Sequence, residues 1–223
     1  MPRVYNIVFK RKNQSLDQQI GFTDIESFID RFLTQKQEFL NKKIKVTSEI
    51  DDIDPKTVEN LWAFLNFYLE TKQKCAAKMQ AYNKKLTANK ANEEIKRAMR
   101  EFARMNGNGK FLRAALVALG YQNYSDQNDY LALALAVEVF QTSILIHDDI
   151  IDKADTRRGN PTIPVSYKQI YSHISSDFKD KQADFANSMA LCIGDLGFYL
   201  ADELIVTNYS QNKQLSKILS YYH

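Results

Sequence analysis

The sequence predicts an all-α fold, and three observations lead to that class. Only 7 glycines and 4 prolines occur in 223 residues, too few for the turns that an all-β chain needs about every eight to twelve residues. Apolar residues recur at the spacing of an amphipathic helix in one segment after another. Hydrophobic residues make up 44% of the chain and charged residues 26%, as in folded globular domains. We therefore expect one large helical domain with an accessory segment.

Two helices are expected in the N-terminal part of the sequence. After a short extended start at residues 4–9, residues 25–33 show helical spacing behind two residues that can cap a helix. A second helix, with a proline in its first turn, is expected over residues 55–85. A Lys- and Asn-rich joint follows and marks a boundary. We expect a helical N-terminal extension at residues 1–90 and the main domain at residues 91–223.

Helices and turns alternate through the main domain. The segment RRGNPTIP contains Gly159, Pro161 and Pro164 and is predicted to be a loop. Two glycines, Gly194 and Gly197, lie in a segment of small residues within a long helical stretch. The expected helices are 93–105, 111–119, 130–152, 177–206 and one from residue 212 onward.

Composition argues against several classes of partner and location. The net charge is only +3, and no dense Lys/Arg run is interleaved with aromatic residues, so we expect no nucleic acid partner. Cys75 and Cys192 match neither a disulfide framework nor a CxxC site, so we expect core thiols in a reducing, cytoplasmic setting. The N-terminus lacks the pattern of a secretory signal. The apolar run at residues 131–146 is short for a membrane span and carries Glu138 and Gln141, so no membrane insertion is expected.

An acidic cluster followed by two arginines is the feature that points to chemistry. In the segment LIHDDIIDKADTRRGNPT, Asp148 and Asp152 are four residues apart and share a helix face, with Asp149 alongside. Two carboxylates about 4 Å apart repel by roughly 1 to 4 kcal/mol, so a cation is expected there. Mg²⁺ suits a few carboxylates completed by water and phosphate oxygens. Arg157 and Arg158 carry forked donors that match phosphate. The pattern therefore predicts a magnesium-bridged diphosphate site.

The alternative for this cluster is a solvated helix end with ordinary ion pairs. Leu145 and Ile146 lead directly into the acids, so a buried helix emerges at this point, which favours the floor of a cavity. His147 stands beside hard oxygen ligands, and we interpret it as a packed core residue rather than a metal ligand.

Three segments, HDDIIDKADTRRG, GNGKFLRAAL and CIGDLGFYLADELI, together resemble motifs of a known family, the trans-isoprenyl diphosphate synthases, which include farnesyl and geranylgeranyl diphosphate synthases. HDDIIDKADTRRG resembles their first aspartate-rich motif with its Arg pair. GNGKFLRAAL resembles their Gly-Gly-Lys segment and keeps Lys110 and Arg113 at the Lys-x-x-Arg spacing. CIGDLGFYLADELI resembles their Gly-Asp helix. Gln141 falls where the family places a polar residue; on its own it would be interpreted as a core amide. The resemblance spans about residues 93–204.

The resemblance implies an isoprenoid synthase-type helical bundle, a homodimer or a heteromer with a related synthase subunit. It implies a Mg²⁺-dependent prenyltransferase that condenses isopentenyl diphosphate with an allylic diphosphate into a linear polyprenyl diphosphate. Asp148 and Asp152 would ligate Mg²⁺, with Asp149 supporting them, and these three acids would be the catalytic set. The implied substrate-binding residues are Arg157 for the allylic diphosphate and Lys110, Arg113, Gln141 and Arg158 for isopentenyl diphosphate.

The resemblance also bears on product length. In the family, bulky aromatics four or five residues before the first Asp restrict the product, whereas this sequence has Ser143 and Ile144 there. We expect a product longer than farnesyl, with Phe140 as a deeper floor of the tail pocket.

The sequence departs from the family pattern in three places. Phe111 and Ala114 replace a basic residue and a proline, and residues 1–90 exceed what the family has before Gly-Gly-Lys. No second aspartate-rich motif follows the Gly-Asp helix before His223, so we expect either the N-terminal part of a longer enzyme or a truncated relative. The alternative function is a non-catalytic diphosphate-binding subunit that modulates a complete synthase. A class I terpene cyclase ranks third, because it would not need a second diphosphate site.

Overall fold

The computed structural model describes most of the residues that follow residue 54 and three short strands before it. The protein divides into two compact units, residues 1–65 and 66–223, and each is considered by itself. The described residues are 5–10, 19–22, 45–46, 55–88, 92–107, 109–125, 129–174 and 179–222. Their elements are β1 (Tyr5–Lys10), β2 (Gln19–Phe22), β3 (Lys45–Val46), α3 (Pro55–Thr87), α4 (Glu93–Asn106), α5 (Leu112–Gln122), α6 (Leu131–Ile151), β4 (Thr156–Arg157), β5 (Asn160–Pro161), α7 (Ile163–Ile174), α8 (Lys179–Tyr209) and α9 (Leu215–Tyr222).

In the first unit, β1 is the central strand of an antiparallel sheet with the order β2-β1-β3. Tyr5 pairs with Phe22, and Phe9 pairs with Val46. The extended start predicted at residues 4–9 therefore corresponds to β1. The helix predicted at residues 25–33 lies outside the described residues. The boundary between the two units falls inside α3, whereas the sequence placed its boundary after that helix.

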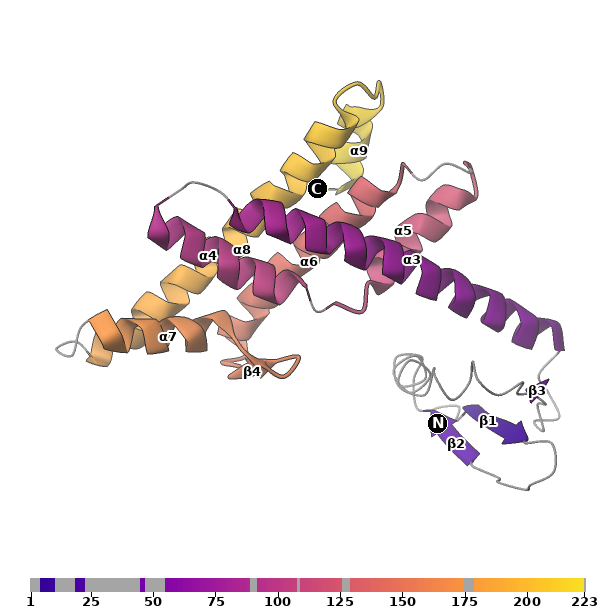
Figure 1. The fold of residues 1–223 in the computed structure, drawn as a ribbon, viewed down its shortest axis with the longest axis horizontal. Coiled ribbons are helices and arrows are strands. Elements are labelled where there is room, and N and C mark those ends of the chain that lie inside the picture. Colours follow the sequence, from indigo (N-terminus) through magenta and orange to yellow (C-terminus); the bar gives the residue numbers. More distant parts are fainter. Residues whose placement is uncertain are drawn as a thin grey trace. The chain divides into compact units, whose positions relative to one another are not determined.

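The second unit is helical, and α6 is its central helix, with α5 and α8 packed against it and α7 packed on α8 (Figure 1). The all-α prediction is confirmed for this unit. The predicted helices 93–105 and 130–152 match α4 and α6 within about two residues. Asn92 explains where α4 starts, because its side-chain oxygen accepts the Ile95 backbone N–H at 2.9 Å. Large side chains with less than 2% exposure form the core, among them Tyr68, Phe102, Tyr130, Leu135, Ile146, Tyr167 and Ile193.

Two glycines on α8 allow it to approach α6 closely. A Cβ at Gly197 would lie 2.0 Å from the Ser143 Oγ and 2.4 Å from the Phe102 ring. A Cβ at Gly194 would lie 2.3 Å from Nε2 of His147. A Cβ at either position would force the Ser143, Phe102 or His147 side chain to shift, so packing rather than backbone freedom favours glycine at both. The close approach fixes the rotation of α6, and with it the direction of the acids at its C-terminal end.

The segment predicted as a loop after α6 contains a small hairpin and the start of a helix that the sequence did not predict. Arg157 pairs with Asn160 across a two-residue turn. The prolines of this segment therefore do not mark a continuous loop, since Pro161 lies in β5 and Pro164 in α7. Pro164 lies in the first turn of α7, where a missing N–H costs no hydrogen bond and the fixed φ suits a helix. The prediction of loop structure at Pro164 was wrong for this reason.

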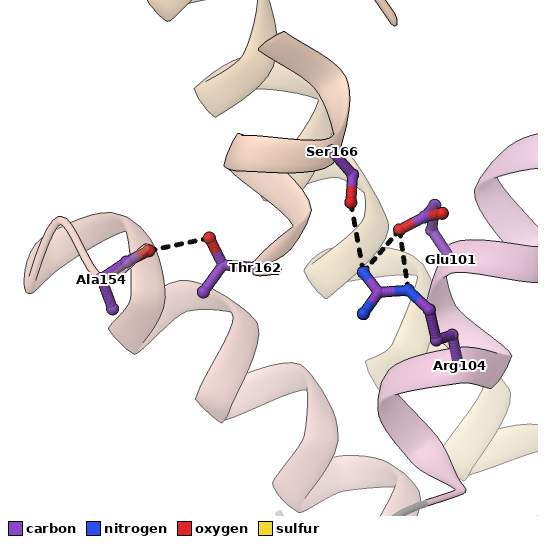
Figure 2. A network of polar contacts seen from close by, with 5 residues as sticks. All are labelled: Glu101, Arg104, Ala154, Thr162 and Ser166. Atoms are coloured by element: carbon purple, nitrogen blue, oxygen red, sulfur yellow. Dashed lines mark hydrogen bonds and ion pairs between the residues drawn. The ribbon is translucent and has the colours of Figure 1, made fainter. Parts of the chain in front are cut away.

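A polar network holds α7 against α4 beside this hairpin (Figure 2). The Arg104 guanidinium donates to Glu101 at 2.6 Å and to the Ser166 Oγ at 3.3 Å. The Thr162 hydroxyl donates to the Ala154 carbonyl at 2.7 Å, which closes the base of the loop between α6 and α7. The loop therefore has fixed ends, although most of its residues reach solvent.

The structure also tests the expected burial of the two cysteines and describes the helix that contains the most apolar run. Cys75 is buried as predicted, but Cys192 is exposed, so its interpretation as a core thiol was wrong. Among the described residues, α6 is the one helix long and apolar enough to cross a membrane by its length and composition. It packs between α5 and α8 and carries the buried side chains of Glu138 and Asp149, as core helices of folded domains do. The absence of membrane insertion stays a prediction.

Candidate diphosphate and metal site

The acidic cluster lies at the C-terminal end of α6, as predicted. Asp148 is partly exposed and Asp152, the residue that follows the helix, is exposed, whereas Asp149 is only 1% exposed. The Asp152 backbone N–H still donates to the Asp148 carbonyl at 2.8 Å, so the helical turn continues through both residues. The side chains of Asp148 and Asp152 consequently share the accessible face, while that of Asp149 turns into the protein.

Asp149 is paired with Arg157 inside the protein. Nε of Arg157 donates to Oδ1 of Asp149 at 2.5 Å, and the second carboxylate oxygen is buried with no partner among the described residues. Burial raises the pKa of Asp149, the Arg157 hydrogen bond lowers it, and the neighbouring Asp148 and Asp152 raise it. This arrangement suits the supporting role that the sequence assigned to Asp149.

The hairpin turns the side chain of Arg158 away from that of Arg157. Arg158 and Gly159 are the two turn residues between β4 and β5, and both have positive φ, 53° and 76°. Positive φ at both positions is the geometry of a type I′ turn, which matches the twist of a two-stranded ribbon. Arg157 therefore points to the end of α6, while the Arg158 guanidinium lies near Gly109, at the start of α5.

The start of α5 brings the other predicted cations to this place. Lys110 and Arg113 are both exposed, and the Tyr68 hydroxyl of α3 donates to the Lys110 carbonyl at 2.6 Å. Charges on Arg113 and Arg158 both act on one carboxylate of α6. We call these three residues the basic cluster: Lys110, Arg113 and Arg158.

The remaining predicted residues lie along α6. Gln141 and Ile144 are partly exposed and precede Asp148 by two turns and one turn, on the same face. The Phe140 ring packs on Phe198 and on Tyr222, with centroid distances of 5.0 and 5.3 Å. Ser143, by contrast, is fully buried against Gly197. The roles of Phe140, Ser143 and Ile144 in setting product length stay predictions.

Sequence reasoning missed two residues that support this site. Glu138, treated only as a charge in an apolar run, is 8% exposed and accepts the Ala114 backbone N–H at 2.9 Å. The second residue is Tyr68, which sequence reasoning did not connect with the site and whose hydroxyl donates to the Lys110 carbonyl. A single Glu within an apolar helix was the available signal for Glu138, since such a residue is rarely buried without partners.

His147 packs against α8 but is only partly buried, with 23% of its side chain exposed, so it is a packed residue at the edge of the core rather than inside it. Its ring contacts Phe198 edge-on at 5.5 Å, and its Nε2 lies 3.3 Å from the Leu191 carbonyl and 3.4 Å from Oδ1 of Asp195. These contacts point it toward α8 rather than toward the acids.

The donor set suits a hard divalent cation with an incomplete protein shell. Within the described residues no group of three or more His, Cys, Asp or Glu side chains could hold a metal ion. Two accessible carboxylates one helical turn apart, Asp148 and Asp152, leave most coordination positions to water and phosphate oxygens, as Mg²⁺ prefers. The residues present therefore fit Mg²⁺ together with a bound diphosphate and do not fit a closed structural metal site.

Comparisons with known proteins point to one family. A family model described as polyprenyl synthetase matches residues 70–220. The protein is 33% identical over 112 residues to a short chain isoprenyl diphosphate synthase of Methanocaldococcus jannaschii, a match to 50% of its own length and 28% of that protein. It is 32% identical over 75 residues to heptaprenyl diphosphate synthase component 2 of Geobacillus stearothermophilus, a match to 33% and 23%.

Among solved structures, a geranylgeranyl pyrophosphate synthase of Corynebacterium glutamicum, complexed with isoprenyl diphosphate and magnesium, has a TM-score of 0.48 and 25% identity. The matched part makes up 64% of the present protein and 41% of that one. The present sequence thus spans less than half of the length of each of these three proteins.

Proposed function

The chain belongs to the polyprenyl synthetase family, and from that premise we propose that it acts in a Mg²⁺-dependent prenyl transfer. The reaction is the condensation of isopentenyl diphosphate with an allylic diphosphate into a linear polyprenyl diphosphate. One observation carries the proposal: two accessible carboxylates at the end of α6 face solvent beside a hairpin whose arginines diverge. A cytoplasmic location and assembly with a second copy or a related synthase subunit belong to the same proposal.

Two separate groups of residues would bind the two diphosphates. Asp148 and Asp152 would hold Mg²⁺, which supplies Lewis-acid stabilisation of a departing diphosphate. Arg157, kept in place by Asp149, presents the rest of its guanidinium to the allylic diphosphate. The basic cluster binds the diphosphate of isopentenyl diphosphate, and Gln141 lies between the two groups along α6. Ile144 lies one turn before Asp148, where the prenyl tail would run.

A non-catalytic, diphosphate-binding subunit is the second candidate. The similarity to a protein named heptaprenyl diphosphate synthase component 2 fits assembly with a partner component, whereas the non-catalytic role is a hypothesis that this name does not address. Such a subunit would use the same basic cluster and acids for binding, and its partner would complete the site.

Incorporation of radiolabelled isopentenyl diphosphate tests the proposal. The 223-residue protein is incubated with Mg²⁺ and dimethylallyl, geranyl or farnesyl diphosphate in turn, beside Asp148→Ala and an exposed control, Asp184→Asn. Extended products that Asp148→Ala abolishes and Asp184→Asn keeps would support the enzyme and report the product length. Mg²⁺-dependent diphosphate binding without products would favour the subunit. Failure to bind either diphosphate would contradict both functions.

A further inference from the structure

Glu138 is a buried carboxylate to which the proposed function assigns neither substrate binding nor metal binding. It lies on α6 one turn before Gln141, and its side chain is removed from water. Its Oε1 accepts the Ala114 backbone N–H at 2.9 Å. A buried charge is costly unless it is hydrogen-bonded and balanced by opposite charge, so its partners indicate what keeps it there.

The first partner is the N-terminus of α5. Phe111 occupies the capping position with φ of 58°, and its own side chain does not cap the helix. The first amides of a helix need acceptors, and Glu138 supplies one from a neighbouring helix. This bond fixes the turn that carries Arg113, while Tyr68 holds the Lys110 carbonyl from the side of α3.

The second partner is the hairpin turn after α6. A Cβ at Gly109 would lie 3.5 Å from Oε2 of Glu138 and 3.8 Å from Nη1 of Arg158, so these atoms face the same small space. Charges on Arg113 and Arg158 both favour the ionised form of Glu138. Arg113 and Arg158 together carry two positive charges against the single negative charge of Glu138, so the charge balance around this carboxylate is positive.

We propose that Glu138 is a positioning residue for the basic cluster, which binds the diphosphate of isopentenyl diphosphate. It fixes the start of α5 through one oxygen and aligns Arg158 through the charge on the other. It does not touch the substrate itself. The inference rests on the proposed function, because it assigns Glu138 to that substrate's site.

Glu138→Gln separates positioning from a merely structural role. The amide oxygen can still accept the Ala114 N–H, but the amide NH₂ then faces the Arg158 guanidinium, so donor meets donor. We expect a melting temperature close to that of the wild type and an isopentenyl diphosphate affinity about tenfold lower, as for a lost charged hydrogen-bonding partner. Glu138→Ala also removes the acceptor for α5, so its melting temperature and its affinity should both fall.

Calorimetric titration of the 223-residue protein with isopentenyl diphosphate in EDTA measures this affinity. EDTA removes the metal that binding at the acids would require, so the cationic site is observed alone. Asp184→Asn is the matched control for the loss of one negative charge, because Asp184 is exposed on α8. Wild-type affinity in Glu138→Gln would overturn the inference and leave the proposed function standing. Absence of binding by the wild type in EDTA and in Mg²⁺ would overturn both.

Discussion

Arg157 donates through its Nε to the buried carboxylate of Asp149 at 2.5 Å, eight residues earlier in the sequence. The Asp149 side chain is fully buried, whereas that of Arg157 is 25% exposed. The two partners are therefore not equivalent. Loss of the arginine strands a charge inside the protein, whereas the arginine itself could turn to water if the acid were lost.

We expect Arg157→Ala to lower the free energy of unfolding by about 3 to 5 kcal/mol, because it leaves the Asp149 carboxylate buried without its partner. Arg100→Ala, on the exposed face of α4, is the control and should cost less than about 1 kcal/mol, as for an exposed charge. Urea denaturation of both variants measures the difference. Equal effects would contradict a special role for the Asp149–Arg157 pair.

Gly159→Ala should lower the free energy of unfolding by about 1 to 2 kcal/mol, because the φ of 76° is unfavourable for a residue with a Cβ. The same variant should weaken diphosphate binding, since the turn directs Arg157 and Arg158 apart. Gly120→Ala is the control: it lies within α5 with nothing near its Cβ position and should stabilise the protein by about 0.5 to 1 kcal/mol. Thermal denaturation and calorimetry distinguish the two. A stabilised Gly159→Ala variant would refute the turn geometry.

Gly197→Ala tests the close contact between α6 and α8. The added methyl would lie 2.0 Å from the Ser143 Oγ and 2.4 Å from the Phe102 ring, so these side chains or the helices that carry them must shift. Overpacking of this kind costs about 1 to 3 kcal/mol, and Gly120→Ala again serves as the control. Because the contact also fixes the rotation of α6, Mg²⁺-dependent diphosphate binding should weaken as well. Wild-type stability in Gly197→Ala would show that the helices are not in contact as described.

The helices and the acidic cluster were predictable because their signals are local. Apolar spacing predicted α4 within about two residues, and Asp148 and Asp152 share a face in any helix. The direction of Asp149 was not predictable, since it depends on how α6 rotates against Gly194 and Gly197.

The difference between local signals and tertiary contacts also explains why α7 and the partner of Glu138 were not predicted. The helix α7 was missed because Pro164 is equally at home in a loop and in the first turn of a helix. The partner of Glu138 is a backbone amide 24 residues away, and no sequence pattern identifies a backbone donor at that separation.

Glu138 should leave a signature in the pH dependence of stability. Burial raises the pKa of Glu138 above 4.5, while Ala114, Arg113 and Arg158 act against that rise. Between 4.5 and the raised value the folded protein keeps a proton that the unfolded protein has lost. The free energy of unfolding therefore falls as the pH rises through this window. The Cys75 thiol of α3, whose pKa is about 11, stays neutral there and adds no slope.

We expect Glu138→Gln to remove this contribution, so the stability of the variant relative to the wild type rises as the pH is raised from 4.5. Urea denaturation at a series of pH values in EDTA gives the two curves. Asp184→Asn, exposed on α8, should leave the decline in place. A difference between Glu138→Gln and the wild type that stays constant with pH would mean that Glu138 titrates as it does in the unfolded protein. That result would be incompatible with a buried carboxylate held by α5 and Arg158.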